Sequence, residues 1–164
     1  MNIGLLGAGT VGGNVAKLIR ERDELGFVLS KVLVRDLNKA RAGIDNAHLT
    51  TNPSEIIDAS DILVEVMGGM TLATETMLAA LQCGKRVVTA NKAALAEQWQ
   101  TFKPYIQKGL LYFEASVMAG TPTIGALTGV LRGSRPLELH AILNGTCNYI
   151  LSEIEKGVPY EKAL

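Results

Sequence analysis

Hydrophobic and polar positions along the chain follow two spacings, one typical of strands and the other typical of helices. Short, nearly continuous apolar runs predict buried strands, whereas apolar residues three or four positions apart predict one face of a helix. The expected strands are Asn2–Leu6, Phe27–Val34, Ile62–Met67, Arg86–Ala90, Leu110–Val117 and Leu137–Leu143. The apolar positions of the expected helices are Val11, Val15, Leu18 and Ile19; Ala73, Met77, Ala80 and Leu81; Leu95, Trp99 and Phe102; Ile124, Leu127 and Leu131; and Cys147, Leu151 and Ile154.

Two further helix starts carry local signals. Asn52-Pro53-Ser54-Glu55 combines a capping residue, a proline at the first helical position and a glutamate three residues after the cap. Thr121-Pro122 likewise starts the helix that contains Ile124. The charged segment 35–46 between the second strand and the first of these starts reads as a loop or a weak helix.

Strands and helices alternate over most of the chain. This order, with strands that are apolar on both faces, is typical of a mainly parallel sheet covered by helices on both faces. The expected fold class is therefore α/β and doubly wound. The final helix follows a complete-looking α/β unit, so it indicates the beginning of a second structural region.

A glycine-rich turn connects the first strand directly to the first helix, with the sequence Gly7-Ala8-Gly9-Thr10-Val11-Gly12. In this context Gly7 permits the tight turn, Gly9 leaves room for a pyrophosphate and Gly12 lets the helix pack closely on the strand. The N–H groups of the first helical turn and the helix dipole then attract the anion. The sequence therefore predicts a Rossmann-type dinucleotide-binding domain, to which we assign residues 1–133.

The end of the second strand bears on which dinucleotide is bound. An acidic residue about 20 positions after the turn holds the 2′-hydroxyl of NAD, while an arginine there favours the 2′-phosphate of NADP. Arg35 occupies this position, with Lys39 and Arg41 close behind, and Asp36 comes one position late. We expect NADP, with NAD as the other possibility; the alternative is that Arg35 is a solvated loop charge.

Composition narrows the class of protein further. Apolar residues make up 48% of the 164 residues, and lysine plus arginine equals the acidic residues at 16 each. This zero balance gives no reason to expect a nucleic-acid or membrane-surface partner, and no apolar run is long enough to span a bilayer. Cys83 and Cys147 lie far apart and read as reduced thiols. These features favour a cytoplasmic protein.

Four segments beyond the glycine turn are more specific. They are Val64-Glu65-Val66-Met67-Gly68-Gly69, Val87-Val88-Thr89-Ala90-Asn91-Lys92-Ala93, Phe113-Glu114-Ala115-Ser116-Val117-Met118-Ala119-Gly120-Thr121-Pro122 and Leu143-Asn144-Gly145-Thr146-Cys147-Asn148-Tyr149-Ile150-Leu151. Together, in this order after the turn, they closely resemble homoserine dehydrogenase, over essentially the whole chain. The resemblance implies reversible oxidation of homoserine to aspartate 4-semialdehyde, with hydride transfer to a nicotinamide, in the biosynthesis of threonine, methionine and isoleucine.

Two positions at the ends of expected strands gain a role from this resemblance. Met67 lies where ligands bind in open α/β sheets, and the resemblance implies that its backbone lines the cofactor. Lys92 follows the next strand within an otherwise apolar stretch, so we expect it to be partly desolvated. The resemblance implies that Lys92 lies beside the nicotinamide and the substrate and takes part in catalysis; the alternative is a surface lysine.

The loop after the fifth strand is rich in small residues, so its carbonyl groups can turn toward one point. Carbonyl and carboxylate oxygens suit a hard cation. The resemblance implies a monovalent-cation site, for sodium, with oxygens at Glu114, Val117, Ala119 and Thr121. Many relatives have glycine at position 119 and an aliphatic residue at position 121, so this chain departs slightly from the pattern. A loop that only enters the next helix is the alternative.

The last segment begins a region that the resemblance assigns to the substrate. Asn144, Gly145 and Thr146 are expected to line the substrate pocket, although Thr146 could also only cap the last helix. Residues 134–164 are thus expected to start the substrate-binding and dimerisation region, apparently truncated. The chief acid/base lysine and the carboxylates that hold homoserine lie further along in the family. We therefore expect the chain to bind NADP(H) but to turn over homoserine poorly or not at all.

Two other readings stay open at this point. One is a stand-alone NADP-binding regulatory module of the Rossmann type, which would have no need of Lys92 or of Asn144-Gly145-Thr146. The other is an oxidoreductase similar to aspartate dehydrogenase, which substrate-binding residues would distinguish. The full-length family member is expected to be a homodimer with a small-molecule substrate.

Overall fold

The computed structural model describes residues 1–142 and 144–164, which form two compact units, Met1–Thr121 and Pro122–Leu164. The units divide after Thr121, whereas the sequence analysis placed its domain boundary after residue 133. The functional assignment of the two expected domains stays a prediction.

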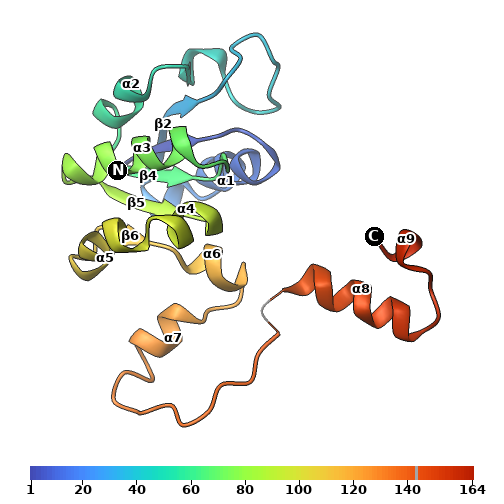
Figure 1. The fold of residues 1–164 in the computed structure, drawn as a ribbon. Coiled ribbons are helices and arrows are strands. Elements are labelled where there is room, and N and C mark those ends of the chain that lie inside the picture. Colours follow the sequence, from blue (N-terminus) through green and yellow to red (C-terminus); the bar gives the residue numbers. More distant parts are fainter. Residues whose placement is uncertain (143) are drawn as a thin grey trace. The chain divides into compact units, whose positions relative to one another are not determined.

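The first unit is built on one six-stranded sheet (Figure 1). Its strands follow the order β3-β2-β1-β4-β5-β6, and every described pair is parallel. This is the strand order of a Rossmann fold, which confirms the expected fold class. The strands are β1 (Asn2–Leu6), β2 (Val28–Leu33), β3 (Leu49–Thr50), β4 (Ile62–Glu65), β5 (Arg86–Thr89) and β6 (Leu111–Tyr112).

Helices connect these strands and cover both faces of the sheet. The helices of the first unit are α1 (Thr10–Glu21), α2 (Pro53–Asp58), α3 (Thr71–Gln82), α4 (Lys92–Glu97), α5 (Trp99–Gln107) and α6 (Glu114–Met118), with short 3-10 turns η1 (Asp23–Leu25) and η2 (Asn46–His48). The start of α2 is the expected one, because the Asn52 side chain accepts a hydrogen bond from the Ser54 N–H at 3.0 Å. The single helix expected around Leu95 and Phe102 is divided in two at Gln98.

Two apolar clusters form the core, one on each face of the sheet. The face covered by α1 holds Ile3, Leu5 and Ala16, whereas Leu6, Leu63 and the inward side chains of α2, α3, α4 and α5 pack on the other. Alternate residues of one strand therefore enter opposite clusters, as the pleat of a strand requires. The helices pack on the two faces of the sheet. They leave the edge at the carboxyl ends of the strands open.

The sheet reverses its strand order between β1 and β4, and this position fixes the ligand-binding rim. Leu6 at the end of β1 pairs with Leu33 of β2 on one side and with Glu65 of β4 on the other. Glu65 in turn pairs with Thr89 at the end of β5. In open α/β sheets ligands bind outside the carboxyl ends of the strands at such a switch point.

The strand expected at Leu110–Val117 is wrong beyond its first residues. Only Leu111–Tyr112 pair with β5, and Glu114–Met118 form the helix α6. The Ser116 hydroxyl lies 2.6 Å from the carbonyl oxygen of Phe113 and 3.2 Å from that of Thr89. These contacts turn the chain back after the short strand, so residues after Tyr112 leave the sheet.

The second unit contains α7 (Ile124–Thr128), α8 (Gly145–Glu155) and α9 (Tyr160–Ala163). The strand expected at Leu137–Leu143 is wrong for residues 137–142, which have no partner strand within the described part of the chain; Leu143 lies outside the described residues. The cap of α8 is Asn144 and not Thr146, because the Asn144 side chain accepts the Cys147 N–H at 2.9 Å.

Candidate functional site

The glycine turn between β1 and α1 has a geometry that only glycine fits at two positions. Gly7 has φ +103° and its N–H donates to the Leu33 carbonyl at 3.0 Å; a side chain there would collide with the Met67 backbone. A side chain at Gly12 would collide with the Gly7 carbonyl group. Because of these contacts, the glycine turn packs directly against the ends of β2 and β4, and the first turn of α1 packs directly against the turn.

Gly9 differs, because a side chain built on it would meet no atom within 4 Å. It is the N-cap residue of α1, and no side chain caps this helix end. Thr10 and Val11 in the first helical turn are exposed. The N–H groups of this turn are thus accessible over open space, an arrangement that suits a phosphate group.

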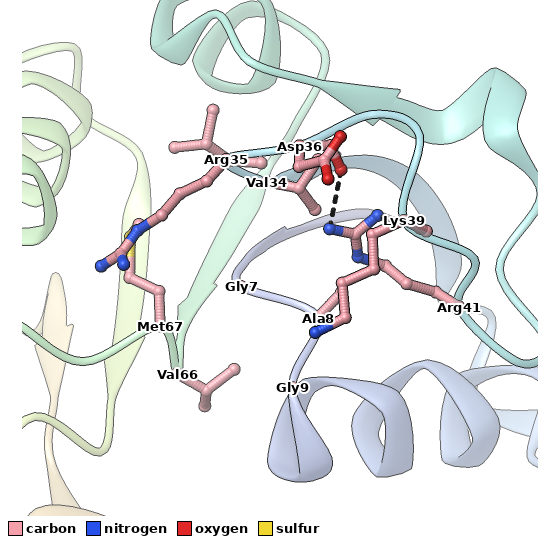
Figure 2. Close-up of a pocket in the computed structure, with 11 residues that line it drawn as sticks. Gly7, Ala8, Gly9, Val34, Arg35, Asp36, Lys39, Arg41, Val66 and Met67 are labelled. Carbon is pink, nitrogen blue, oxygen red and sulfur yellow. Dashed lines mark hydrogen bonds between the residues drawn. The ribbon is translucent and has the colours of Figure 1, made fainter.

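A pocket extends from this turn across the end of β2 to the end of β4 (Figure 2). It brings together five residues of the predicted cofactor site, namely Gly7, Ala8, Gly9, Arg35 and Met67. Asp36, Lys39 and Arg41 also line it. Figure 2 shows the Arg35 side chain reaching toward Met67, while Lys39 and Arg41 lie on the side of Ala8.

The three basic side chains of this pocket are held differently. The Arg41 guanidinium donates to the carbonyl oxygens of Lys39 at 2.6 Å and of Asp36 at 2.9 Å, so it stabilises the loop after β2. Arg35 and Lys39 are exposed at the pocket. The pocket therefore presents positive charge beside the end of β2, where a 2′-phosphate group would be accommodated.

Lys92 lies in a second, more apolar pocket together with Val117, Trp99 and Phe113. The two aromatic rings stand edge to face with centroids 5.9 Å apart. Lys92 is the first residue of α4, whose N-cap Asn91 accepts the Ala94 N–H at 3.1 Å. The lysine side chain is exposed in this chain, so the expected desolvation is wrong for the chain by itself.

The expected cation ligands all come from one short segment. Glu114 and Val117 lie in α6, Ala119 follows its last turn and Thr121 is exposed after it. Ala119 has φ +51° and ψ −110°, backbone angles that a residue with a side chain rarely adopts. Because Val117 lies in the last helical turn, its carbonyl group has no partner within the helix. The described residues contain no group of three or more His, Cys, Asp or Glu side chains that could hold a metal ion.

Asn144, Gly145 and Thr146 form the exposed start of α8 in the second unit. The assignment of these residues to a substrate pocket stays a prediction. The same holds for the roles assigned to the cofactor and cation residues.

Sequence reasoning missed the part that Glu65 and Thr89 play at this rim. Both are buried at the carboxyl ends of β4 and β5, and the Thr89 hydroxyl donates to the Glu65 carboxylate at 2.6 Å. A signal was present, because Glu65 stands two positions after Leu63 and hence faces the same side of the sheet as that core leucine. A charged residue at an inward position of an apolar strand indicates a buried polar contact.

Comparison with known proteins shows the family to which the chain belongs. A family model described as "Homoserine dehydrogenase, NAD binding domain" matches residues 7–104, and one described as "Homoserine dehydrogenase" matches residues 122–164. The chain belongs to the homoserine dehydrogenase family. Homoserine dehydrogenases of Neisseria gonorrhoeae and Bacillus subtilis are 39% and 36% identical to it, respectively, each over 100% of the chain.

Solved structures of the family share the fold. A homoserine dehydrogenase from Thiobacillus denitrificans superposes with a TM-score of 0.86 at 39% identity, over 100% of this chain and 41% of that one. A hyperthermophilic archaeal homoserine dehydrogenase in complex with NADPH gives a TM-score of 0.78 at 26% identity, over 99% of this chain and 58% of that one. These matches favour the homoserine dehydrogenase expectation over the regulatory module and the protein similar to aspartate dehydrogenase.

The chain spans 40% of the Neisseria gonorrhoeae homoserine dehydrogenase and 41% of the Bacillus subtilis one. It corresponds to an amino-terminal part of these relatives, with the NAD-binding domain at residues 7–104 and the match to the second family model at residues 122–164. Within the described part of the chain, no helix has the length and apolar character needed to cross a bilayer. The absence of nucleic-acid partners and the cytoplasmic location stay predictions.

Proposed function

We propose that this chain is the NADP(H)-binding part of an enzyme that interconverts L-homoserine and L-aspartate 4-semialdehyde. The observation that carries the proposal is the pocket that joins the open turn at Gly9 to the exposed cations Arg35 and Lys39. A pyrophosphate needs the first feature and a 2′-phosphate needs the second. An NADPH complex of an archaeal relative supports the same choice of cofactor.

Each part of the pocket has its own role in this proposal. The first turn of α1, from Thr10 to Gly12, donates N–H groups to the pyrophosphate, and Gly7 and Gly9 let it approach the backbone. Arg35 and Lys39 pair with the 2′-phosphate, while Arg41 keeps their loop in place through its bonds to carbonyl groups. NAD, which lacks the 2′-phosphate, would leave both cations without an anionic partner.

Met67 at the end of β4 and Lys92 at the start of α4 would hold the nicotinamide half. When bound, NADP+ would supply the hydride acceptor for oxidation of the alcohol, and the chain's residues would bind and orient the reactants. Met67 lines the cofactor through its backbone, and Lys92 acts on the substrate from the start of α4. Asn144, Gly145 and Thr146 contribute to the substrate pocket in the whole enzyme.

A monovalent cation, sodium, completes the proposed site. Backbone oxygens of Val117 and Ala119 and the side chain or backbone of Glu114 and Thr121 would hold it. The whole enzyme is proposed to be a homodimer that serves the biosynthesis of threonine, methionine and isoleucine.

Fluorescence titration of the 164-residue chain with NADPH tests the first part of the proposal. We expect saturable binding that is competed by adenosine 2′,5′-bisphosphate, because that fragment carries the 2′-phosphate. A chain that folds but binds neither compound would refute the proposal. Homoserine-dependent reduction of NADP+ is expected from the full-length enzyme and little or none from the 164-residue chain.

A further inference from the structure

Glu65 is a charged residue that is 0% exposed at the end of a core strand. One carboxylate oxygen, Oε1, accepts the N–H groups of Met67 at 3.0 Å and of Gly68 at 3.2 Å. The other, Oε2, accepts the Thr89 hydroxyl at 2.6 Å. Burying a carboxylate is strongly unfavourable unless hydrogen bonds replace the lost water, and here three donors do so.

Thr89 continues the network to the start of α4. Its hydroxyl oxygen also accepts the Asn91 N–H at 3.0 Å. The Asn91 amide group in turn donates to the Gly69 carbonyl at 2.7 Å and accepts the Ala94 N–H at 3.1 Å. The turn after β4 is thus tied to the end of β5 through both Glu65 and Asn91.

The turn that this network holds has little stabilisation of its own. Gly68 and Gly69 both have positive φ values, +68° and +75°, and a side chain on either would meet no atom within 4 Å. Two consecutive glycines have wide conformational freedom in the absence of other restraints. The hydrogen bonds to Glu65 and Asn91 therefore select one conformation of a turn that could adopt many.

The core itself gives no reason for a carboxylate at this position. An apolar side chain of similar volume would fill the same space but would leave the N–H groups of Met67 and Gly68 and the Thr89 hydroxyl without this acceptor. The turn that Glu65 anchors begins with Met67, which lines the pocket of the glycine turn, and the network ends beside Lys92, which lines the second pocket. Its members thus connect the two pockets along the rim.

We propose that Glu65 is a positioning residue that, through Thr89, fixes the Met67–Gly69 turn and the start of α4 for the nicotinamide half of the cofactor. The proposal rests on the proposed function, because it places that half of the dinucleotide along this rim. The adenosine half is assigned to Gly9 and Arg35, which take part in none of the hydrogen bonds of this network.

The experiment compares four variants of the 164-residue chain. Glu65→Leu removes the acceptor of both turn N–H groups, and Thr89→Val removes the hydroxyl that bridges Glu65 and Asn91. Thr76→Val is the matched control, since Thr76 is equally buried but its hydroxyl donates to a carbonyl within its own helix, that of Leu72. Thr89→Ser keeps the bridging hydroxyl and serves as the rescue variant.

Two readouts are measured on each variant. The first is amide hydrogen exchange at Met67 and Gly68 without nucleotide, expected to quicken about tenfold in Glu65→Leu and Thr89→Val through loss of a charge-assisted bond. The second is the affinity for NADPH and for adenosine 2′,5′-bisphosphate. We expect NADPH to bind about tenfold more weakly to these two variants and the fragment to bind within about twofold of wild type.

The control and rescue variants decide between a positioning role and a purely structural one. Thr76→Val and Thr89→Ser are expected to match wild type in both readouts. Equal losses for NADPH and for the fragment, or unchanged exchange at Met67 and Gly68 in Thr89→Val, would overturn the proposal. Should Glu65→Leu not fold, Thr89→Val still decides it. A wild-type chain that binds neither nucleotide contradicts the proposed function instead. In that case the hydrogen-exchange rates alone test whether Glu65 and Thr89 hold the Met67–Gly69 turn.

Discussion

The two compact units of the chain bury their apolar side chains to very different extents. Met1–Thr121 has a cluster on each face of its sheet, with Leu63 0% exposed. In Pro122–Leu164 the only buried hydrophobic residue within the described part of the chain is Ala163, whereas Leu137 and Leu139 are 91% and 78% exposed. A helix or strand is stable only when its apolar face is covered. The first unit therefore supplies its own core, and the second needs contacts beyond its own residues.

The proposed cofactor site lies within the unit that has its own core, although the chain spans only 40% of a relative such as the Neisseria gonorrhoeae enzyme. The glycine turn, Arg35 and the network around Glu65 all lie in the first unit. The residues assigned to the substrate, Asn144 to Thr146, lie in the second. We expect cofactor binding to be a property of this chain and turnover to be a property of the whole enzyme.

Hydrogen exchange should show the contrast most strongly. Core amides such as those of Leu5 and Leu63 exchange only when the first unit opens, while those of α8 exchange from local fraying. We expect rates at least about 1,000-fold slower for the core strands, measured residue by residue by NMR. Amides of α8 that are protected from exchange as strongly as those of β1 would contradict the claim that only the first unit has a core of its own.

Matched leucine substitutions should separate the units by stability. Leu63→Ala leaves a cavity in the core and is expected to lower the free energy of unfolding by about 2–5 kcal/mol. Leu139→Ala removes an exposed side chain and should change it by less than about 0.5 kcal/mol. Urea denaturation measures both, and similar losses for the two variants would contradict this account.

The sequence was sufficient for the parts of the fold whose partners lie within the first unit. The glycine turn and the Asn52 cap are formed as expected, and the strand expected at Ile62–Met67 forms over Ile62–Glu65, because each depends on neighbours within the first unit. The run at Leu137–Ile142 also has mostly apolar residues, interrupted by Glu138 and His140, yet it forms no strand. A short apolar run becomes a strand only where another strand accepts its hydrogen bonds, which local pattern does not reveal.

Side-chain hydrogen bonds explain the other differences. Ser116 turns the chain into α6 by bonding to carbonyl groups, and Asn144 takes the capping position that Thr146 could have filled. Lys92, which was expected to be partly desolvated, is exposed as the first residue of α4. The importance of Glu65 was also missed, since its three donors come from two separate segments.

Removing the positive charge of Arg35, just after β2, should weaken the binding of NADPH but not that of NADH. Arg35→Ala is expected to weaken NADPH binding about tenfold and NADH binding less than about twofold, because only NADPH offers a 2′-phosphate to pair with. Arg86→Ala is the control, an exposed arginine at the amino end of β5. Fluorescence titration gives all the dissociation constants, and equal losses for both cofactors in Arg35→Ala would exclude the proposed pairing.

The smallest effect is expected at Ala119, at the end of α6. Its positive φ is unfavourable for any residue with a side chain, so Ala119→Gly should raise the free energy of unfolding by about 1 kcal/mol. Ala115→Gly, in the helix itself, should lower it by about 0.5–1 kcal/mol. Thermal or urea denaturation distinguishes the two, and a loss of stability in Ala119→Gly would argue against the backbone angles described at this position.

The central claim is that this chain by itself forms a site for a dinucleotide with a 2′-phosphate. Titration of the unmodified 164-residue chain with NADPH and NADH, at one ionic strength, tests it most directly. We predict that NADPH binds at least about tenfold more tightly than NADH, as expected for charge-assisted contacts to the phosphate. Equal or tighter binding of NADH, or no binding of either by the folded chain, would contradict the account.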